Sequence, residues 1–115
     1  MILVATYSSR YCVALKQFVE DLGYHALATT DGEDAWEIYR GRKKELELAI
    51  LDANLSNKSG VTIMQDMRAM DPKFPVILLF RSDQKHFIDE PDVHCLNNPV
   101  DKDELRELVI ELTMF

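Results

Sequence analysis

The run Leu48-Ala49-Ile50-Leu51-Asp52-Ala53-Asn54-Leu55 sets the architecture of this chain. Its first four residues are all apolar, which is typical of a strand buried on both faces of a parallel sheet. The strand ends on a carboxylate, and small and polar residues follow it as far as Gly60. Chemistry in an open parallel sheet takes place just outside the carboxyl ends of the strands. Asp52 is therefore either the reactive centre of the protein or the remnant of one.

Size and charge limit the classes of protein to consider. A chain of 115 residues suits one domain over residues 1–115, with a substantial apolar core. The net charge of −7 argues against nucleic-acid binding, because phosphate affinity needs clustered Lys and Arg. The apolar run over residues 1–5 is too short for a signal sequence or a membrane span. Cys12 and Cys95 fit neither a metal site nor a disulfide framework, so we expect a cytoplasmic protein with reduced, buried thiols.

Two further features have ordinary structural interpretations. Basic residues gather near the end of a predicted helix, where cations suit the helix dipole: Arg40, Arg42, Lys43 and Lys44. Three methionines lie along the next predicted helix: Met64, Met67 and Met70. Core packing is the simpler interpretation of the methionines, and a partner-binding patch is the alternative.

Strands and helices alternate outward from residues 48–52. Apolar runs predict further strands over 2–5, 24–29, 75–80 and 94–97. Helical spacing and caps predict helices from Ser8 or Ser9 to Gly23, from Thr30 or Asp31 to Gly41, over 60–70, and from Asp101 onward. Residues 81–93 are weakly patterned and suffice for one or two helical turns. The alternation predicts a parallel sheet with helices on both faces.

Several short motifs occur along the chain in an order that is typical of one protein family. They are Ile2-Leu3-Val4, Leu22-Gly23-Tyr24, Thr30-Asp31-Gly32-Glu33-Asp34-Ala35, Leu51-Asp52 followed by Gly60, Phe74-Pro75-Val76-Ile77, and Asn98-Pro99-Val100. In this order and at these spacings the whole chain resembles the receiver domain of bacterial two-component response regulators (CheY-like). The resemblance implies a single three-layer, doubly wound (βα)5 flavodoxin-like α/β domain with sheet order 2-1-3-4-5. The segment between Arg81 and Cys95 is about four residues shorter than in the family, roughly one helical turn, so we expect a shortened fourth helix.

The resemblance also implies a phosphoryl-transfer site, and this chain departs from it. In the family an acidic pair and the acceptor aspartate hold magnesium. A lysine and a hydroxyl side chain contact the phosphoryl group, and an aromatic residue of the fifth strand is the switch residue. Asp52 matches the acceptor. The remaining positions carry other residue types: Thr6 and Tyr7 at the acidic pair, Phe80 at the hydroxyl, Cys95 at the aromatic switch and Asn98 at the lysine. Magnesium prefers oxygen ligands that include one or two carboxylates. We therefore expect that the magnesium site is lost and that no metal or other cofactor is bound.

Asp52 has two interpretations at this point. It is either a phosphoacceptor or a retained carboxylate that accepts hydrogen bonds from loop amides or pairs with a cation. Lys58 and Arg81 are the candidate substitute cations beside it.

These observations predict an atypical receiver, or pseudo-receiver, with no enzymatic activity of its own. It would act in two-component or phosphorelay signalling and transcription regulation through protein partners, with no membrane contact. The expected contact surface, also suited to homodimerisation, is the face of the fourth helix, fifth strand and fifth helix: residues 84–89, 94–96 and the last helix. A fused effector domain is a further expectation. The alternatives are a working phosphoreceiver that uses Asp52, and a flavin-like small-molecule binder on a flavodoxin-like sheet.

Overall fold

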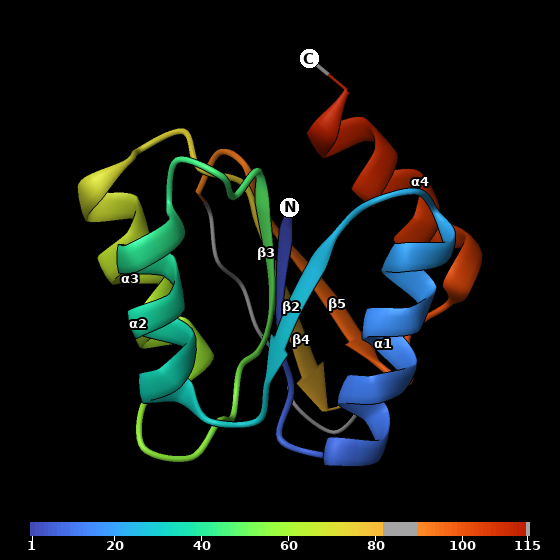
Figure 1. Ribbon diagram of the computed structural model, residues 1–115, viewed down its shortest axis with the longest axis horizontal. Helices are drawn as coiled ribbons and strands as arrows, with labels where there is room; N and C mark the ends of the chain where they lie inside the picture. Colours follow the sequence, from blue (N-terminus) through green and yellow to red (C-terminus); the bar gives the residue numbers. More distant parts are fainter. Residues whose placement is uncertain (82–89, 115) are drawn as a thin grey trace.

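The computed structural model describes residues 1–81 and 90–114, in which strands and helices alternate (Figure 1). The strands are β1 (Ile2–Ala5), β2 (Ala26–Thr29), β3 (Leu48–Asp52), β4 (Val76–Arg81) and β5 (Val93–Asn98). The helices are α1 (Ser9–Asp21), α2 (Gly32–Arg42), α3 (Gly60–Met70) and α4 (Lys102–Thr113). The label α4 therefore denotes the helix that the sequence predicts from Asp101 onward.

The five strands form one parallel sheet in the order β2-β1-β3-β4-β5, which confirms the predicted fold class. The chain leaves β1 toward one side and returns through β3 on the other side, so the direction of winding reverses between these two strands. Loops at such a reversal diverge and leave a crevice at the carboxyl ends of the strands. The fold thus places Asp52, the last residue of β3, at this crevice.

Helices cover both faces of the sheet, and each face has its own apolar core. The helices α2 and α3 lie on one face and α1 and α4 on the other (Figure 1). Alternate residues of β3 supply the two cores: Ala49 and Leu51 face α2 and α3, while Leu48 and Ile50 face α1 and α4. Burial on both sides explains why this strand reads as a continuous apolar run rather than an alternating one.

The helix starts at Ser8, Asp31 and Asp101 have the caps that the sequence predicts, while the cap at Ser59 was not predicted. The side chains of Ser8, Asp31, Ser59 and Asp101 each accept a backbone N–H at the first turn of their helices. Each cap satisfies an amide that would otherwise lack a partner. The chain leaves α1 at Gly23, which has φ +102°, a left-handed conformation that glycine adopts without strain.

Three details differ from the predictions or lie outside the description. β2 begins at Ala26, because pairing with β1 starts at Ile2 and Ala26. Cys12 is buried as predicted, but Cys95 is exposed, so the prediction of two buried thiols is wrong for Cys95. Cys95 lies on the edge strand β5, which has a neighbouring strand on one side only. The predicted shortened fourth helix falls on residues 82–89, outside the described residues.

Candidate functional site

The carboxyl edge of the sheet gathers the residues that the sequence singles out. Asp52 ends β3, Thr6 and Tyr7 follow β1, and Arg81 and Asn98 end β4 and β5. Parallel strands end at the same edge, so positions far apart in sequence become neighbours there. Tyr7, Asp52, Asn54 and Arg81 line a shared pocket of about 190 Å³.

The Asp52 carboxylate is fully buried at this edge, with 0% of the residue exposed. Its Oδ1 accepts a hydrogen bond from the Asn54 backbone N–H at 3.2 Å, and the Tyr7 backbone N–H also donates to the carboxylate. Its Oδ2 has no hydrogen-bond partner within the described part of the chain. A buried oxygen without a partner is costly, and native proteins rarely retain one without a reason.

The environment of Asp52 makes its charged form less favourable than it is in water. Burial raises the pKa of the Asp52 carboxyl above its usual value, because the low-dielectric surroundings disfavour the charge. The amides of Asn54 and Tyr7 and the positive charge of Arg81 act in the opposite direction, and burial outweighs them. Arg81 is thus close enough to Asp52 to act on its charge.

Neutral side chains occupy the end of β1. The hydroxyl of Thr6 is buried and donates to the Ser8 carbonyl at 3.2 Å, so it bonds to its own loop. Tyr7 projects outward with 60% of its surface exposed. Within residues 1–81 and 90–114, no group of three His, Cys, Asp or Glu side chains is placed to hold a metal ion.

Comparison with known proteins identifies this arrangement. Residues 2–110 match the family model of the response regulator receiver domain, which spans nearly the whole chain. The chain belongs to the response regulator receiver family. It is therefore a receiver domain of two-component signalling, as the resemblance implied.

Individual relatives agree with this assignment. The transcriptional regulatory protein RprY of Bacteroides fragilis is 29% identical over 65 residues, which cover 56% of this chain and 27% of that protein. The receiver domain protein of Clostridium thermocellum is 19% identical, with a TM-score of 0.84 over 98% of this chain and 93% of that chain. The receiver domain of an HD domain-containing protein from Pseudomonas fluorescens Pf-5 is 23% identical, with a TM-score of 0.84 over 96% and 91%. These two structural likenesses concern the fold alone.

The donor set of this receiver fits magnesium poorly. Asp52 supplies one carboxylate, while the Thr6 hydroxyl is bonded to Ser8 and Tyr7 points into solvent. Mg²⁺ demands near-octahedral oxygen coordination and usually takes one or two carboxylates together with waters. Arg81 adds a positive charge on the same side, which opposes a second cation near Asp52.

The two candidate substitute cations are placed differently. Arg81 lies beside Asp52, as described above. Lys58 instead pairs with Asp66 at 2.6 Å and lies 4.8 Å above the ring of Trp36. The loop that carries Lys58 is also tied to α2, because the Gly32 N–H donates to the Ser56 carbonyl at 2.9 Å. These contacts hold Lys58 on the α2–α3 face rather than beside Asp52.

The remaining substituted positions have separate surroundings. Phe80 is 2% exposed and belongs to the core beneath α2 and α3. Cys95 is exposed on β5. Asn98 accepts a hydrogen bond at its Oδ1 from the Tyr11 hydroxyl at 2.8 Å. Phe80 and Cys95 are thus outside the lining of the pocket at Asp52, and Asn98 is linked to α1.

Tyr11 is the site residue that the sequence interpretation missed. It lies in the first turn of α1, next to the carboxyl edge, and its hydroxyl bridges to Asn98. Burial raises the pKa of Tyr11, and the nearby charge of Asp52 raises it further, so the hydroxyl stays protonated and donates. Its place in the first turn of the helix after β1 could have identified it from the sequence. Residues in that turn lie at the same edge of the sheet as the carboxyl ends of the strands.

Proposed function

We propose that this receiver is a pseudo-receiver that signals through protein contacts, without magnesium-dependent phosphorylation of Asp52. The observation that carries the proposal is the surroundings of Asp52. Its carboxylate is buried, bonded to two backbone amides and placed beside Arg81, with neutral Thr6 and Tyr7 where a metal would need acidic ligands. That environment suits a fixed structural carboxylate better than a nucleophile.

Rate arguments point the same way. Phosphoryl transfer depends on positioning and on neutralising the charge that develops in the transition state. Removal of a single preorganised electrostatic donor typically lowers a rate by about 10²–10³-fold. Asn98 takes the place of the lysine, and among the described residues Asp52 is the one carboxylate in the lining of the pocket, which suits magnesium poorly.

The partner surface that we propose is the β5–α4 face. A shallow groove of about 300 Å³ follows this face, lined by His94, Cys95, Leu96, Glu104, Glu107, Leu108 and Glu111. A second copy of the chain or an effector protein would dock there. Residues 84–89, which the sequence also assigns to this surface, lie outside the described residues. The exposed Cys95 and the acidic side chains give the face a mixed polar and apolar character, as non-obligate interfaces have.

A place in transcription regulation is a further part of the proposal. RprY, which its name describes as a transcriptional regulatory protein, is much longer than the aligned segment, since the alignment covers 27% of it. An effector domain of that general kind, fused or separate, would respond to the state of this receiver.

In the described residues no helix has the length and apolarity needed to cross a membrane.

One observation favours the alternative of a working phosphoreceiver. Arg81 places a positive charge beside Asp52, where it would attract a phosphoryl group. The flavin-like alternative has less support. The pocket at Asp52, about 190 Å³, is smaller than the roughly 300–1,000 Å³ of most ligand sites. It includes Tyr7 but neither Phe80 nor Asn98 in its lining.

Phosphorylation is tested directly with small phosphodonors. The protein is incubated with magnesium and acetyl phosphate, and its intact mass is recorded, with Asp52→Ala as the matched control. We expect no gain of a phosphoryl group in either protein. A gain that Asp52→Ala abolishes would overturn the pseudo-receiver proposal in favour of the phosphoreceiver.

The proposed homodimer surface is tested by sedimentation velocity. Cys95→Arg and Glu107→Lys change exposed side chains of the β5–α4 face, and Val13→Lys changes a side chain on α1 that is 70% exposed. We expect the first two changes to weaken self-association and Val13→Lys to leave it unchanged. Equal behaviour of all three variants would count against this face.

A further inference from the structure

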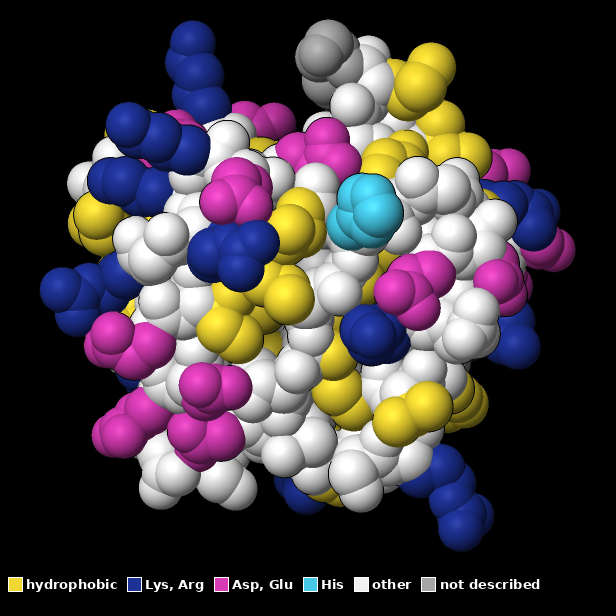
Figure 2. Space-filling model, viewed as in Figure 1, with side chains coloured by type: hydrophobic (Ala, Val, Ile, Leu, Met, Phe, Trp, Pro, Cys, Tyr) yellow, Lys and Arg dark blue, Asp and Glu magenta, His cyan; other side chains and the backbone are white. Residues whose placement is uncertain are grey.

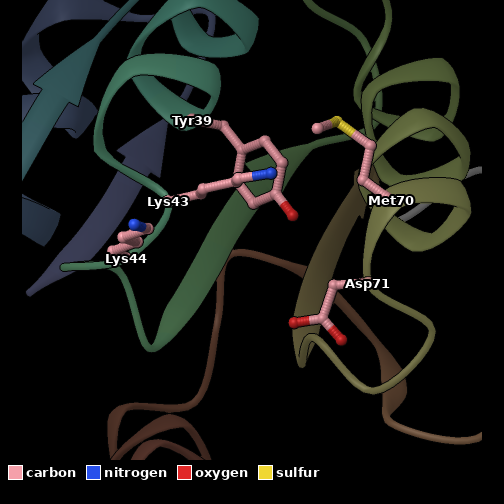
Figure 3. Close-up of a pocket in the computed structure, with 5 residues that line it drawn as sticks. All are labelled: Tyr39, Lys43, Lys44, Met70 and Asp71. Atoms are coloured by element: carbon pink, nitrogen blue, oxygen red, sulfur yellow. The ribbon is translucent and has the colours of Figure 1, made fainter.

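A second pocket lies at the edge of the sheet opposite Asp52. The helices run antiparallel to the strands that they follow, so the C-terminal ends of α2 and α3 meet at the amino edge of the sheet (Figure 1). Between these ends is a hollow of about 300 Å³. Figure 3 shows the side chains that line it: Tyr39, Lys43, Lys44, Met70 and Asp71.

Tyr39 forms the inner wall of this pocket. The residue is 1% exposed, and its ring stacks on Trp36 at 5.7 Å and meets the edge of Phe74 at 5.1 Å between centroids. Its hydroxyl has no hydrogen-bond partner among the residues that the structure describes, and Figure 3 shows it directed toward the pocket. Burial raises the pKa of Tyr39, and the charge of Asp71 adds to the effect. The hydroxyl therefore keeps its proton and is available as a donor.

Lys43 and Lys44 directly follow α2, and they differ from the two arginines in its last turn. Arg40 and Arg42 are already paired, with Glu37 at 3.2 Å and with Glu45 at 2.9 Å. Across residues 1–81 and 90–114, no carboxylate lies within 4 Å of the amino groups of Lys43 and Lys44. Figure 2 shows Lys and Arg side chains gathered at the upper left, where Figure 1 places the end of α2. This positive corner stands out on a chain of net charge −7.

The opposite wall of the pocket carries an acceptor and an apolar surface. One oxygen of Asp71, Oδ1, accepts the Lys73 backbone N–H at 3.1 Å, which leaves Oδ2 for another donor. Met70 is 48% exposed and its side chain lies across the pocket from Tyr39 (Figure 3). The pocket thus combines two cations and a hydroxyl on one side with a carboxylate and a thioether on the other.

We propose that this pocket binds a small organic anion, a phosphate or a carboxylate that also carries a hydroxyl donor. Its anionic group lies between Lys43 and Lys44 and accepts the Tyr39 hydroxyl, its donor bonds to Asp71, and its carbon atoms contact Met70. An anion alone would meet repulsion from Asp71 and from the carbonyl ends of α2 and α3. A hydroxyl on the ligand converts Asp71 from a repelling group into a hydrogen-bond partner. The site is remote from Asp52, so it stands independently of the proposed function.

The binding test uses glycerol 3-phosphate and malate as the two probes, one for each anion type, followed by backbone amide NMR. Glycerol and sodium chloride at matched ionic strength serve as controls. We expect one of the probes to shift amides of residues 39–44 and 70–72, and that probe identifies the anion. Absence of localised shifts with both probes would overturn the proposal.

Three variants separate a built site from diffuse attraction. Lys43→Gln with Lys44→Gln should weaken binding about tenfold or more, as expected for the loss of hydrogen bonds to a charged group. Arg40→Gln with Arg42→Gln removes the same charge from the adjoining last turn of α2 and should leave affinity within about twofold, since neither residue lines the pocket. Tyr39→Phe keeps the ring packing and should weaken binding severalfold.

Equal losses in the two double variants would show that only net charge matters and would overturn the proposal. Binding of an acidic peptide in the absence of any response to either small probe would also overturn it, and would assign the surface to a protein partner instead. Unchanged affinity in Tyr39→Phe, with the lysine dependence intact, would contradict the proposed geometry.

Discussion

Replacement of Asp52 by asparagine should stabilise the protein at neutral pH. The side chain is fully buried, and Oδ2 has no hydrogen-bond partner within the described residues. An unsatisfied buried polar group costs about 1–3 kcal/mol, and a charged one costs more. Asparagine has nearly the same shape and keeps an oxygen for the Asn54 amide. We expect a gain of about 1–2 kcal/mol in the free energy of unfolding at pH 7, after allowing for the buried amide that replaces Oδ2.

The pH dependence of this gain follows from the direction of the pKa shift. The pKa of Asp52 is higher in the folded chain than its usual value of 3.8, so the folded state holds this proton more tightly than the unfolded state. The stability of the native protein therefore falls as pH rises from the unfolded pKa to the folded pKa, by at most about 1.4 kcal/mol per pH unit. Asp52→Asn does not titrate there. Its advantage should be absent below the unfolded pKa and constant above the folded pKa.

Thermal unfolding at a series of pH values measures this advantage. A gain of 1–2 kcal/mol in a domain of this size corresponds to a rise of about 3–10 °C in Tm. Asp21→Asn removes the same charge from an exposed position at the end of α1 and should change stability by less than about 0.5 kcal/mol. A Tm for Asp52→Asn that equals the native value at pH 7, or a difference that stays the same from pH 3 to pH 8, would refute the reasoning.

Gly60→Ala and Tyr11→Phe test the packing around the site by thermal unfolding, with Gly41→Ala as a control for the glycine. In Gly60→Ala the added Cβ would lie 2.0 Å from the carbonyl oxygen of Asp52, so we expect a loss of about 1–3 kcal/mol or more. Gly41 also lies in a helix, but nothing lies within 4 Å of an added Cβ, so Gly41→Ala should raise the free energy of unfolding by about 0.4–1 kcal/mol. Similar effects at the two glycines would contradict this explanation. Tyr11→Phe removes the bond to Asn98 and should cost about 0.5–1.5 kcal/mol; an unchanged Tm would show that the bridge contributes nothing.

The fold could be predicted from the sequence because the local patterns of caps and apolar residues agree with the packing of helices on the sheet. The apolar run of β3 can be buried only between two layers, and the caps at Ser8, Asp31 and Asp101 fix where three of the helices begin. Strand and helix ends were less certain, because pairing with a neighbour decides them. β2 begins at Ala26 since Ile2 of β1 provides the first partner, a fact that no local pattern contains.

Only part of the candidate site could be predicted from the sequence. Residue types alone showed that Asp52 lacks acidic neighbours at Thr6 and Tyr7, because the order of strands fixes which residues meet at the carboxyl edge. The two candidate cations, Lys58 and Arg81, were equivalent in the sequence. The structure separates them, since Lys58 is held by Asp66 and Trp36 while Arg81 faces Asp52.

The sequence by itself determined the order of elements and a parallel sheet covered by helices, because these depend on periodicity and caps along the chain. The order of the strands, and with it the set of residue types at the carboxyl edge, followed from the resemblance to receiver domains. Only the tertiary structure decided the unpartnered oxygen of Asp52, the bridge from Tyr11 to Asn98, and the pocket between Tyr39 and Asp71. Each of these depends on side-chain direction and on the packing of helices onto the sheet. Such contacts join residues distant in sequence, and no local pattern encodes the distance between them.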